Sequence, residues 1–308
     1  AWTENFDYDI WKEAMAECGV DMTFYTLRER SLDEILPWDF IDTGVSRRFL
    51  EREWQRAKEG VVTENCRQKC SACGAMKIKF SKEGPMKFVG HLDTMRYFQK
   101  ALRRAELPVA FSGGYSPHMI MSFAVPLGVG MESLGDYFDL EMAEDMPTAE
   151  IAARLEEQMA EGMNIVIVRK VEDGKAGKAM ALVAAADYLV EFRPGKEPSI
   201  DWKNRVKEFL AQPEIKVTKQ TKRSEKEIDL RPNIYKMEVR ENGFFYMLAS
   251  ASSNYTKPEM VTNTFFHWIG EELPEFAFTV KRLEMYADKG ENASPRFVTL
   301  ESLGEEIE

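Results

Sequence analysis

The sequence predicts an α+β protein made of a small helical, cysteine-bearing segment followed by two tandem ferredoxin-like units. Three observations predict this class. The apolar residues recur at helical spacing up to about residue 60, and three cysteines then stand in a short stretch that has few apolar residues. From Met76 onward, strand-like segments alternate with amphipathic helices. The expected divisions are residues 1–75, 76–174 and 175–308, the last with an acidic C-terminal tail.

The first segment is expected to form two helices joined by an irregular connector. Trp11, Met15 and Cys18 recur at helical spacing, and a second helix is expected from Ser46 with Trp54 on its apolar side. Proline and glycine interrupt the periodicity between them. The cysteine-bearing stretch 61–75 has the composition of a loop that a metal would order.

The first ferredoxin-like unit is expected over residues 76–174. The alternation in DYFDLEM indicates a strand, and an amphipathic helix is expected to bury Leu92, Met95, Gln99 and Leu102 on one side. The order strand, helix, strand, strand, helix, strand is the β-α-β-β-α-β of a ferredoxin-like fold. The expected elements are Met76 to Ser81, Leu92 to Ala105, Met119 to Val125, Asp136 to Met142, Thr148 to Met159 and Asn164 to Val171.

The same order of elements is expected to repeat over residues 175–308, after a boundary in the glycine- and lysine-containing string EDGKAGKAM. The halves share no evident sequence identity, so the repeat is one of topology. The expected strands are Ala185 to Phe192, Ile215 to Thr218, Tyr235 to Arg240, Phe244 to Leu248 and Phe278 to Tyr286, with helices around Phe209 and Phe265.

Composition limits the class of protein. With a formal net charge of −11 over 308 residues, the chain is not one that coats nucleic acid indiscriminately, although a local basic patch is compatible with this charge. The sequence has no apolar run long enough to span a bilayer, and its start AWTENFDYDI lacks the features of a signal peptide. We therefore expect a cytoplasmic protein without a membrane partner. A first residue other than Met suggests a fragment of a longer chain.

The cysteines Cys66, Cys70 and Cys73 form the pattern C-x3-C-x2-C, which suits three thiolates around an iron–sulfur cluster with one iron left open. The order of strands and helices after Cys73 is not that of a radical SAM barrel, so the motif is a partial signal. Zinc is the alternative, because Cys18 would complete a site of four thiolates. Ordinary buried thiols remain a third interpretation.

Two segments resemble known families. Tyr25 to Cys73, with RERSLDEILPWDFIDTGVSRRFLEREWQRA and CRQKCSACG, is similar to the segment that follows the catalytic barrel in uncharacterised radical SAM proteins, some of which carry a cobalamin-type domain. Residues from about 76 to 300 resemble a radical-SAM-linked domain of unknown function, through KFVGHLDTMRYFQKALRRAELPVAFSGGYSPHMIMSFAVPLGVG and KEIDLRPNIY. The resemblance implies that the barrel and its S-adenosylmethionine belong to a missing upstream part or to a partner chain. The visible cysteines would then be an auxiliary site.

Basic residues suggest an RNA-binding surface. On the helix after Gly90 they fall at i, i+4, i+7 and i+8, opposite the expected apolar face. The string FSGGYSPH follows, with glycines that permit close approach to a ligand and an aromatic residue that could stack on a base. A second basic stretch lies around an expected hairpin, and solvated polar surfaces are the plain alternative for both. The candidate RNA-binding residues are Arg96, Lys100, Arg103, Arg104, Gly113, Gly114, Tyr115, Lys219, Lys222, Arg223, Lys226 and Arg231.

The function expected from these features is that of an RNA-binding accessory module, which presents tRNA or ribosomal RNA to a radical SAM active site that this chain alone lacks. One alternative is a metal-independent endoribonuclease that uses His91 and His118 as general acid and base, by analogy with the RAMP proteins of CRISPR systems. More simply, His91 helps to start the helix and His118 packs or binds a phosphate. A protein-interaction scaffold without RNA is the third expectation.

Overall fold

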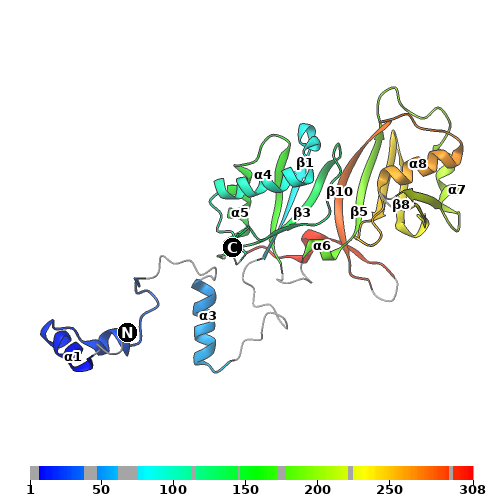
Figure 1. Ribbon diagram of the computed structural model, residues 1–308. Coiled ribbons are helices and arrows are strands. Elements are labelled where there is room, and N and C mark those ends of the chain that lie inside the picture. Colours follow the sequence, from blue (N-terminus) through cyan, green and yellow to red (C-terminus); the bar gives the residue numbers. More distant parts are fainter. Residues whose placement is uncertain are drawn as a thin grey trace. The chain divides into compact units, whose positions relative to one another are not determined.

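The computed structural model describes residues 7–37, 47–61, 75–112, 115–144, 146–171, 178–220, 225–290 and 294–307. The chain divides into two compact units, Ala1–Thr43 and Gly44–Glu308. The elements are labelled in Figure 1. The expected divisions after residues 75 and 174 stay predictions. None of the helices in the described ranges is both long and apolar enough to cross a membrane.

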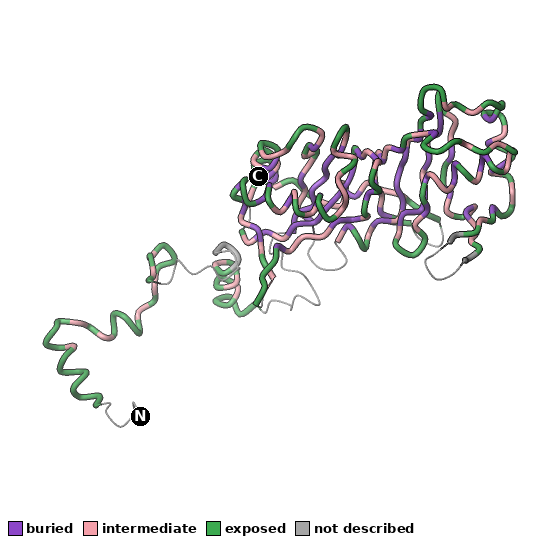
Figure 2. Tube along the Cα trace, turned by 45° about the horizontal axis from the view of Figure 1, so that its top comes forward, coloured by how far each residue is buried: buried purple, intermediate pink, exposed green. Residues whose placement is uncertain are grey.

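The first unit contains two short helices, α1 (Tyr8–Glu17) and α2 (Met22–Thr26). Each begins at an aspartate, Asp7 or Asp21, whose carboxylate accepts backbone N–H groups of the first turn. Figure 2 shows no buried residue along the coloured part of this unit, and none of its described residues is buried. Its helices are therefore fixed by their caps and local contacts rather than by a core.

The second unit begins with α3 (Arg47–Lys58), where a helix was expected. The predicted apolar side of this helix is not covered, because Leu50 and Trp54 are both exposed. The helix is followed by the cysteine-bearing stretch, whose three cysteines at 66, 70 and 73 lie outside the described residues.

The predicted α+β class is confirmed. A nine-stranded sheet runs in the order β4-β1-β3-β10-β5-β9-β8, with β2 paired to β3 and β11 paired to β10. The strands of its second half are β5 (Val183–Phe192), β8 (Ile234–Arg240), β9 (Gly243–Ala249), β10 (Phe278–Asp288) and β11 (Phe297–Thr299). In the first half of the sheet the strands are β1 (Ala75–Lys82), β2 (Met121–Phe123), β3 (Glu132–Glu141) and β4 (Met163–Lys170), with helices α4 (His91–Arg104) and α5 (Thr148–Glu156). β1 pairs antiparallel with both β3 and β4.

The core of the first half follows from the alternation along β1. Met76, Ile78 and Phe80 are buried against α4 and its neighbours, and the Phe80 ring lies 4.8 Å from that of Phe98 on α4. The expected apolar face of α4 is partly wrong. Leu92 is 65% exposed, while Thr94 and Phe98 are buried, because the face that packs on the sheet is rotated around the helix axis from the expected one.

The alternate residues of β1 are charged and nevertheless buried. Lys77 lies 3.3 Å from Asp139 on β3, and Lys79 lies 2.6 Å from Glu284 on β10. Burial lowers the pKa of Lys77, although the Asp139 carboxylate opposes the shift. Since a buried cation requires a partner, Lys77 ties β1 to the neighbouring strand β3, and Lys79 ties it to β10, which is not adjacent to β1 in the sheet.

The second half holds the larger core. Its elements are α6 (Ala179–Leu182), β5 (Val183–Phe192), α7 (Val206–Leu210), β6 (Lys216–Gln220), β7 (Glu225–Asp229), β8 (Ile234–Arg240), β9 (Gly243–Ala249), α8 (Pro258–Ile269), β10 (Phe278–Asp288) and β11 (Phe297–Thr299). Short 3₁₀ helices lie at Gly84–Phe88, Lys203–Arg205, Arg231–Asn233 and Leu300–Leu303. Phe244 and Phe265 are fully buried, with ring centroids 5.6 Å apart. Burying each such ring contributes roughly 1.5–3 kcal/mol.

The two halves of the sheet meet where β3 and β10 run parallel and pair at Lys281–Glu132 and Arg282–Ser133. Close approach here depends on Gly135, because a Cβ atom at this position would lie 2.7 Å from the Leu283 carbonyl oxygen. Arg282 is completely buried at this join, and its Nη1 atom lies 2.8 Å from the Asp136 carboxylate. The two halves of the sheet are therefore joined by a close approach of their backbones and by a buried ion pair.

Candidate functional site

Helix α4 presents a row of cations to solvent. Arg96, Lys100 and Arg103 are exposed, while Ala101 and Leu102 on the other side are buried. Arg96 lies 3.2 Å from Asp93, but both side chains are largely exposed, so this pair is weak and leaves the guanidinium available. The structure thus brings together three of the four basic residues that the sequence singled out on this helix.

The fourth residue, Arg104, has a structural contact. Its Nη2 atom donates to the Gln158 carbonyl oxygen at 3.0 Å, and its Nε atom donates to the Gln158 side chain at 3.3 Å. Gln158 lies just after α5, so Arg104 links the end of one helix to the end of the other. We therefore use the term basic row only for Arg96, Lys100 and Arg103.

The loop between Ser112 and His118 follows α4 in the chain. Ser112 and His118 hold its base, because the Ser112 hydroxyl lies 2.8 Å from the His118 Nδ1 atom and also accepts the His118 backbone N–H. Phe111 is half exposed and Tyr115 is fully exposed. Gly113 and Gly114 lie outside the described residues. The loop therefore presents aromatic side chains next in sequence to the basic row.

The two candidate catalytic histidines have different neighbours. His118 contacts Ser112, whereas His91 lies edge-on to the Phe123 ring and lines a cavity of about 10 Å³ together with Lys82 and Asp136. Burial lowers the pKa of His91. Such a volume holds about one water molecule, so the cavity does not admit a nucleotide.

The expected basic hairpin is formed by β6 and β7. Lys216 at its base lies between Glu214 and Glu227, at 3.1 and 3.5 Å. The Arg231 Nε atom donates to the Leu210 carbonyl oxygen at 2.8 Å and so satisfies the end of α7. Lys222, Arg223 and the side chains of Lys219 and Lys226 lie outside the described residues. The described part of the hairpin is thus less cationic than its sequence suggests.

The expected metal site falls largely outside the described residues. Cys18 is exposed at the end of α1, whereas Cys66, Cys70 and Cys73 are among the residues whose structure is not described. Within the described ranges, no group of three or more histidine, cysteine, aspartate or glutamate residues is arranged to hold a metal ion. An iron–sulfur cluster or zinc at the four cysteines therefore stays a prediction.

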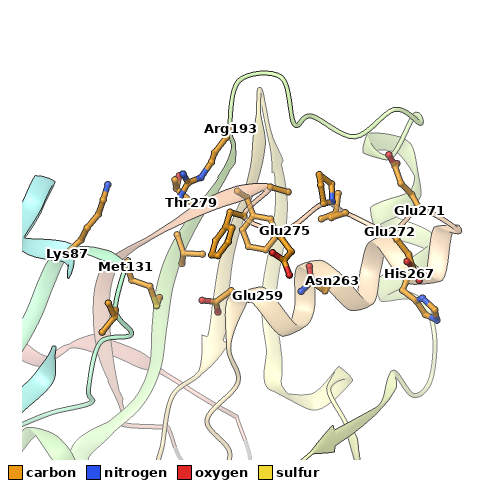
Figure 3. Close-up of a pocket in the computed structure, with 18 of the residues that line it drawn as sticks. Lys87, Met131, Arg193, Glu259, Asn263, His267, Glu271, Glu272, Glu275 and Thr279 are labelled. Carbon is orange, nitrogen blue, oxygen red and sulfur yellow. The ribbon is translucent and has the colours of Figure 1, made fainter. Parts of the chain in front are cut away.

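Sequence reasoning did not find the large cavity, which measures about 800 Å³. Its walls come from the loops at Lys87–Phe88 and Val129–Met131 of the first half, and from α8 and residues 271–280 of the second half. Figure 3 shows Glu259, Asn263 and Glu275 in the middle of the view and His267 toward one side. The spacing of residues 259, 263 and 267 at i, i+4 and i+8 is the sequence signal that would have indicated this wall.

The comparisons with known proteins give a family. The curated proteins contain no match to the sequence. Among solved structures, the crystal structure of a Cbf5-Nop10-Gar1 complex matches with a TM-score of 0.37 and 11% sequence identity, over 69% of this chain and 48% of that one. This chain therefore spans about half the length of that match. Residues 76–258, more than half of the chain, match the family described as an uncharacterized protein conserved in bacteria (DUF2344), and the chain belongs to this family.

Proposed function

We propose that this chain is an RNA-binding accessory module of a radical SAM enzyme system. The observation that carries the RNA-binding part is the basic row on α4, where Arg96, Lys100 and Arg103 are all exposed. The chain as a whole has a net charge of −11, so the basic row is a locally positive surface on a protein that is negative overall.

The spacing of the basic row suits a sugar–phosphate backbone. Residues 96, 100 and 103 are separated by about one helical turn each, which distributes the three cations over about 10 Å along the helix axis. Arginine and lysine at such intervals contact phosphate oxygens without regard to base sequence. The basic row would therefore supply affinity and position rather than sequence specificity.

The loop beyond α4 adds groups that suit single-stranded RNA. Phe111 is 48% exposed and Tyr115 has no cover at all. Exposed aromatic rings stack on unpaired bases, whereas they have little to contact on an A-form duplex. We therefore favour a single-stranded region, such as a loop of tRNA or ribosomal RNA, over a double helix.

The platform in this proposal is a pair of ferredoxin-like units. Two observations support it. In the first half β1 lies between β4 and β3, and β2 pairs with β3; in the second half β5 lies between β10 and β9, and β8 pairs with β9. In each half the first strand therefore lies between the last strand and the third strand, as in a ferredoxin-like unit. This count leaves out the hairpin β6–β7, which is inserted between α7 and β8 in the second half. An experimental structure that separates β2 from β3 would contradict this.

The link to a radical SAM enzyme rests on the sequence resemblance of residues 25–73 and 76–300. In this proposal the partner supplies the catalytic barrel and S-adenosylmethionine, and this chain presents the RNA. Affinity purification of the tagged chain from its native cells under anaerobic conditions tests the link. A radical SAM protein should be recovered with it or be found as part of the same longer chain, and repeated recovery of neither would contradict the association.

RNA binding is tested by fluorescence anisotropy with a labelled, short single-stranded RNA of mixed sequence. The triple variant Arg96→Glu, Lys100→Glu, Arg103→Glu should bind far more weakly than the parent. Loss of three phosphate contacts should also reduce the slope of log affinity against log salt by about 2.

The matched control carries the same charge change on other exposed lysines, as Lys207→Glu, Lys257→Glu, Lys289→Glu. It should retain most of the affinity, because those lysines lie outside the basic row. Equal loss in both triple variants would show only a response to net charge and would refute the proposed surface. A duplex of the same length should bind more weakly than the single strand.

A further inference from the structure

The 800 Å³ cavity has the size of a small-molecule site, since such sites usually measure about 300–1,000 Å³. It lies between loops of the first half and α8 of the second half (Figure 3). The basic row is absent from its lining, so the cavity is a separate site from the proposed RNA surface.

The polar wall of the cavity follows one side of α8. Glu259, Asn263 and His267 lie at successive turns of this helix and all line the cavity. At 1.5 Å per residue, the first and last of them are about 12 Å apart along the axis. The wall is therefore long, which suits an extended ligand better than a compact one.

The lining of the whole cavity carries a net negative charge. Four carboxylates, those of Glu259, Glu271, Glu272 and Glu275, line the cavity, whereas its basic residues are Lys87 and Arg193, which gives four negative and two positive charges and a net charge of −2 with histidine neutral. Lys87 is further neutralised by Glu132 outside the cavity, at 3.2 Å. The carboxyl-terminal end of α8 adds a negative partial charge to that of the carboxylates.

Two carboxylate oxygens on this wall lack hydrogen-bond donors. The Oε2 atoms of Glu259 and Glu271 are buried and have no partner among the residues that the structure describes. The other oxygen of Glu271 accepts from the backbone and the hydroxyl group of Ser199. A buried carboxylate oxygen without a donor is costly, so a cation bound in the cavity would offset part of that cost through its charge.

The remaining lining is apolar and open. Phe88, Val129 and Phe276 are 66%, 67% and 75% exposed, although each is a large apolar side chain. Phe276 also has a φ angle of 55°, an uncommon conformation for a residue other than glycine. Methylene groups would cover this surface, and aromatic rings attract alkylammonium ions.

We propose that this cavity binds a linear polyamine, a chain of protonated amines separated by short methylene segments. The amines would pair with the carboxylates that line the cavity, while the methylene segments lie on the apolar side chains. The four carboxylates extend from Glu259 on α8 to Glu275 in the segment after it, so several separated cations suit them better than a single one. RNA is not the occupant, because the carboxylates repel phosphate.

Isothermal titration of the full chain with spermidine, in the absence of RNA, tests the proposal. One molecule should bind per chain, and the variant Glu259→Gln, Glu275→Gln should bind at least about tenfold more weakly because it removes two charge-assisted contacts. Glu161→Gln, which changes an exposed carboxylate outside the cavity, should bind like the parent. Asn263→Trp keeps every carboxylate but places a large ring between Glu259 and His267 in the cavity, and it should also weaken binding.

Two results would overturn the proposal. The first is an absence of saturable spermidine binding, or binding that the Glu259→Gln, Glu275→Gln variant leaves unchanged. The second is full competition by magnesium ions at equal charge concentration, which would show that the site responds to positive charge alone. Circular dichroism of each variant confirms that the fold is retained. Because no RNA is present, neither result bears on the basic row.

Discussion

The buried pair Arg282–Asp136 should contribute more to stability than any exposed pair of the same geometry. Arg282 is 0% exposed, its Nη1 atom lies 2.8 Å from Asp136, and the same nitrogen donates to the Val125 carbonyl oxygen at 3.1 Å. In Arg282→Met, the Asp136 carboxylate stays at the join of the two halves of the sheet, where the Ser133 hydroxyl still donates to it at 2.9 Å. Breaking a buried pair in this way costs about 3–5 kcal/mol.

A control of equal geometry is available on β8. Arg240 lies 2.8 Å from Glu238, but their side chains are 47% and 36% exposed. Arg240→Met should therefore cost less than about 1 kcal/mol, because water already screens this pair. Urea unfolding followed by circular dichroism measures both variants under the same conditions.

The double variant Asp136→Asn, Arg282→Met separates loss of the pair from loss of packing. Once the uncompensated carboxylate is gone, the double variant should be less destabilised than the sum of the single variants, by about 1–3 kcal/mol. If Arg282→Met costs no more than Arg240→Met, or if the single effects simply add, then the buried pair does not stabilise the join and the reasoning fails.

Two further predictions concern the same sheet. Gly135→Ala should lower the free energy of unfolding by about 1–3 kcal/mol, since its Cβ atom would lie 2.7 Å from the Leu283 carbonyl oxygen. Thermal unfolding measures this effect, with Gly90→Ala as the control because a Cβ atom there has ordinary room. Equal effects in the two variants would contradict the prediction. Burial raises the pKa of Asp187 in the folded protein above its ordinary value of 3.8. The stability of the parent relative to Asp187→Asn should therefore fall as the pH rises from 3.8 to the folded-state pKa, and then level off. Urea unfolding at a series of pH values measures this difference, with exposed Asp201→Asn as the control, and a difference that does not change with pH would contradict the prediction.

Local patterns predicted much of the secondary structure. The helix expected from Leu92 to Ala105 is α4, and the strand expected from Met76 to Ser81 is β1. The strand expected from Asp136 begins earlier, at Glu132, because its first residues pair with β10. That pairing joins segments that are far apart in the chain, so no local sequence pattern predicts it.

The candidate site was predicted less completely. The basic row was visible in the sequence because helical spacing alone puts its three members on one face. Arg104 and Arg231 belonged to the same prediction, yet their guanidinium groups hydrogen-bond to Gln158 and Leu210. A lysine or arginine in a sequence carries the same charge whether it faces solvent or ends a helix, and only its neighbours in space distinguish the two.

The sequence by itself determined the α+β class, the order of most helices and strands after Met76, and the face of α4 that carries the basic row, because periodicity and charge are local properties. The tertiary structure alone decided that Lys79 is buried beside Glu284, which lies 205 residues away, and that two loops and α8 enclose a cavity. Burial, pairing and enclosure depend on groups brought together by folding, and so they are absent from any single stretch of the chain.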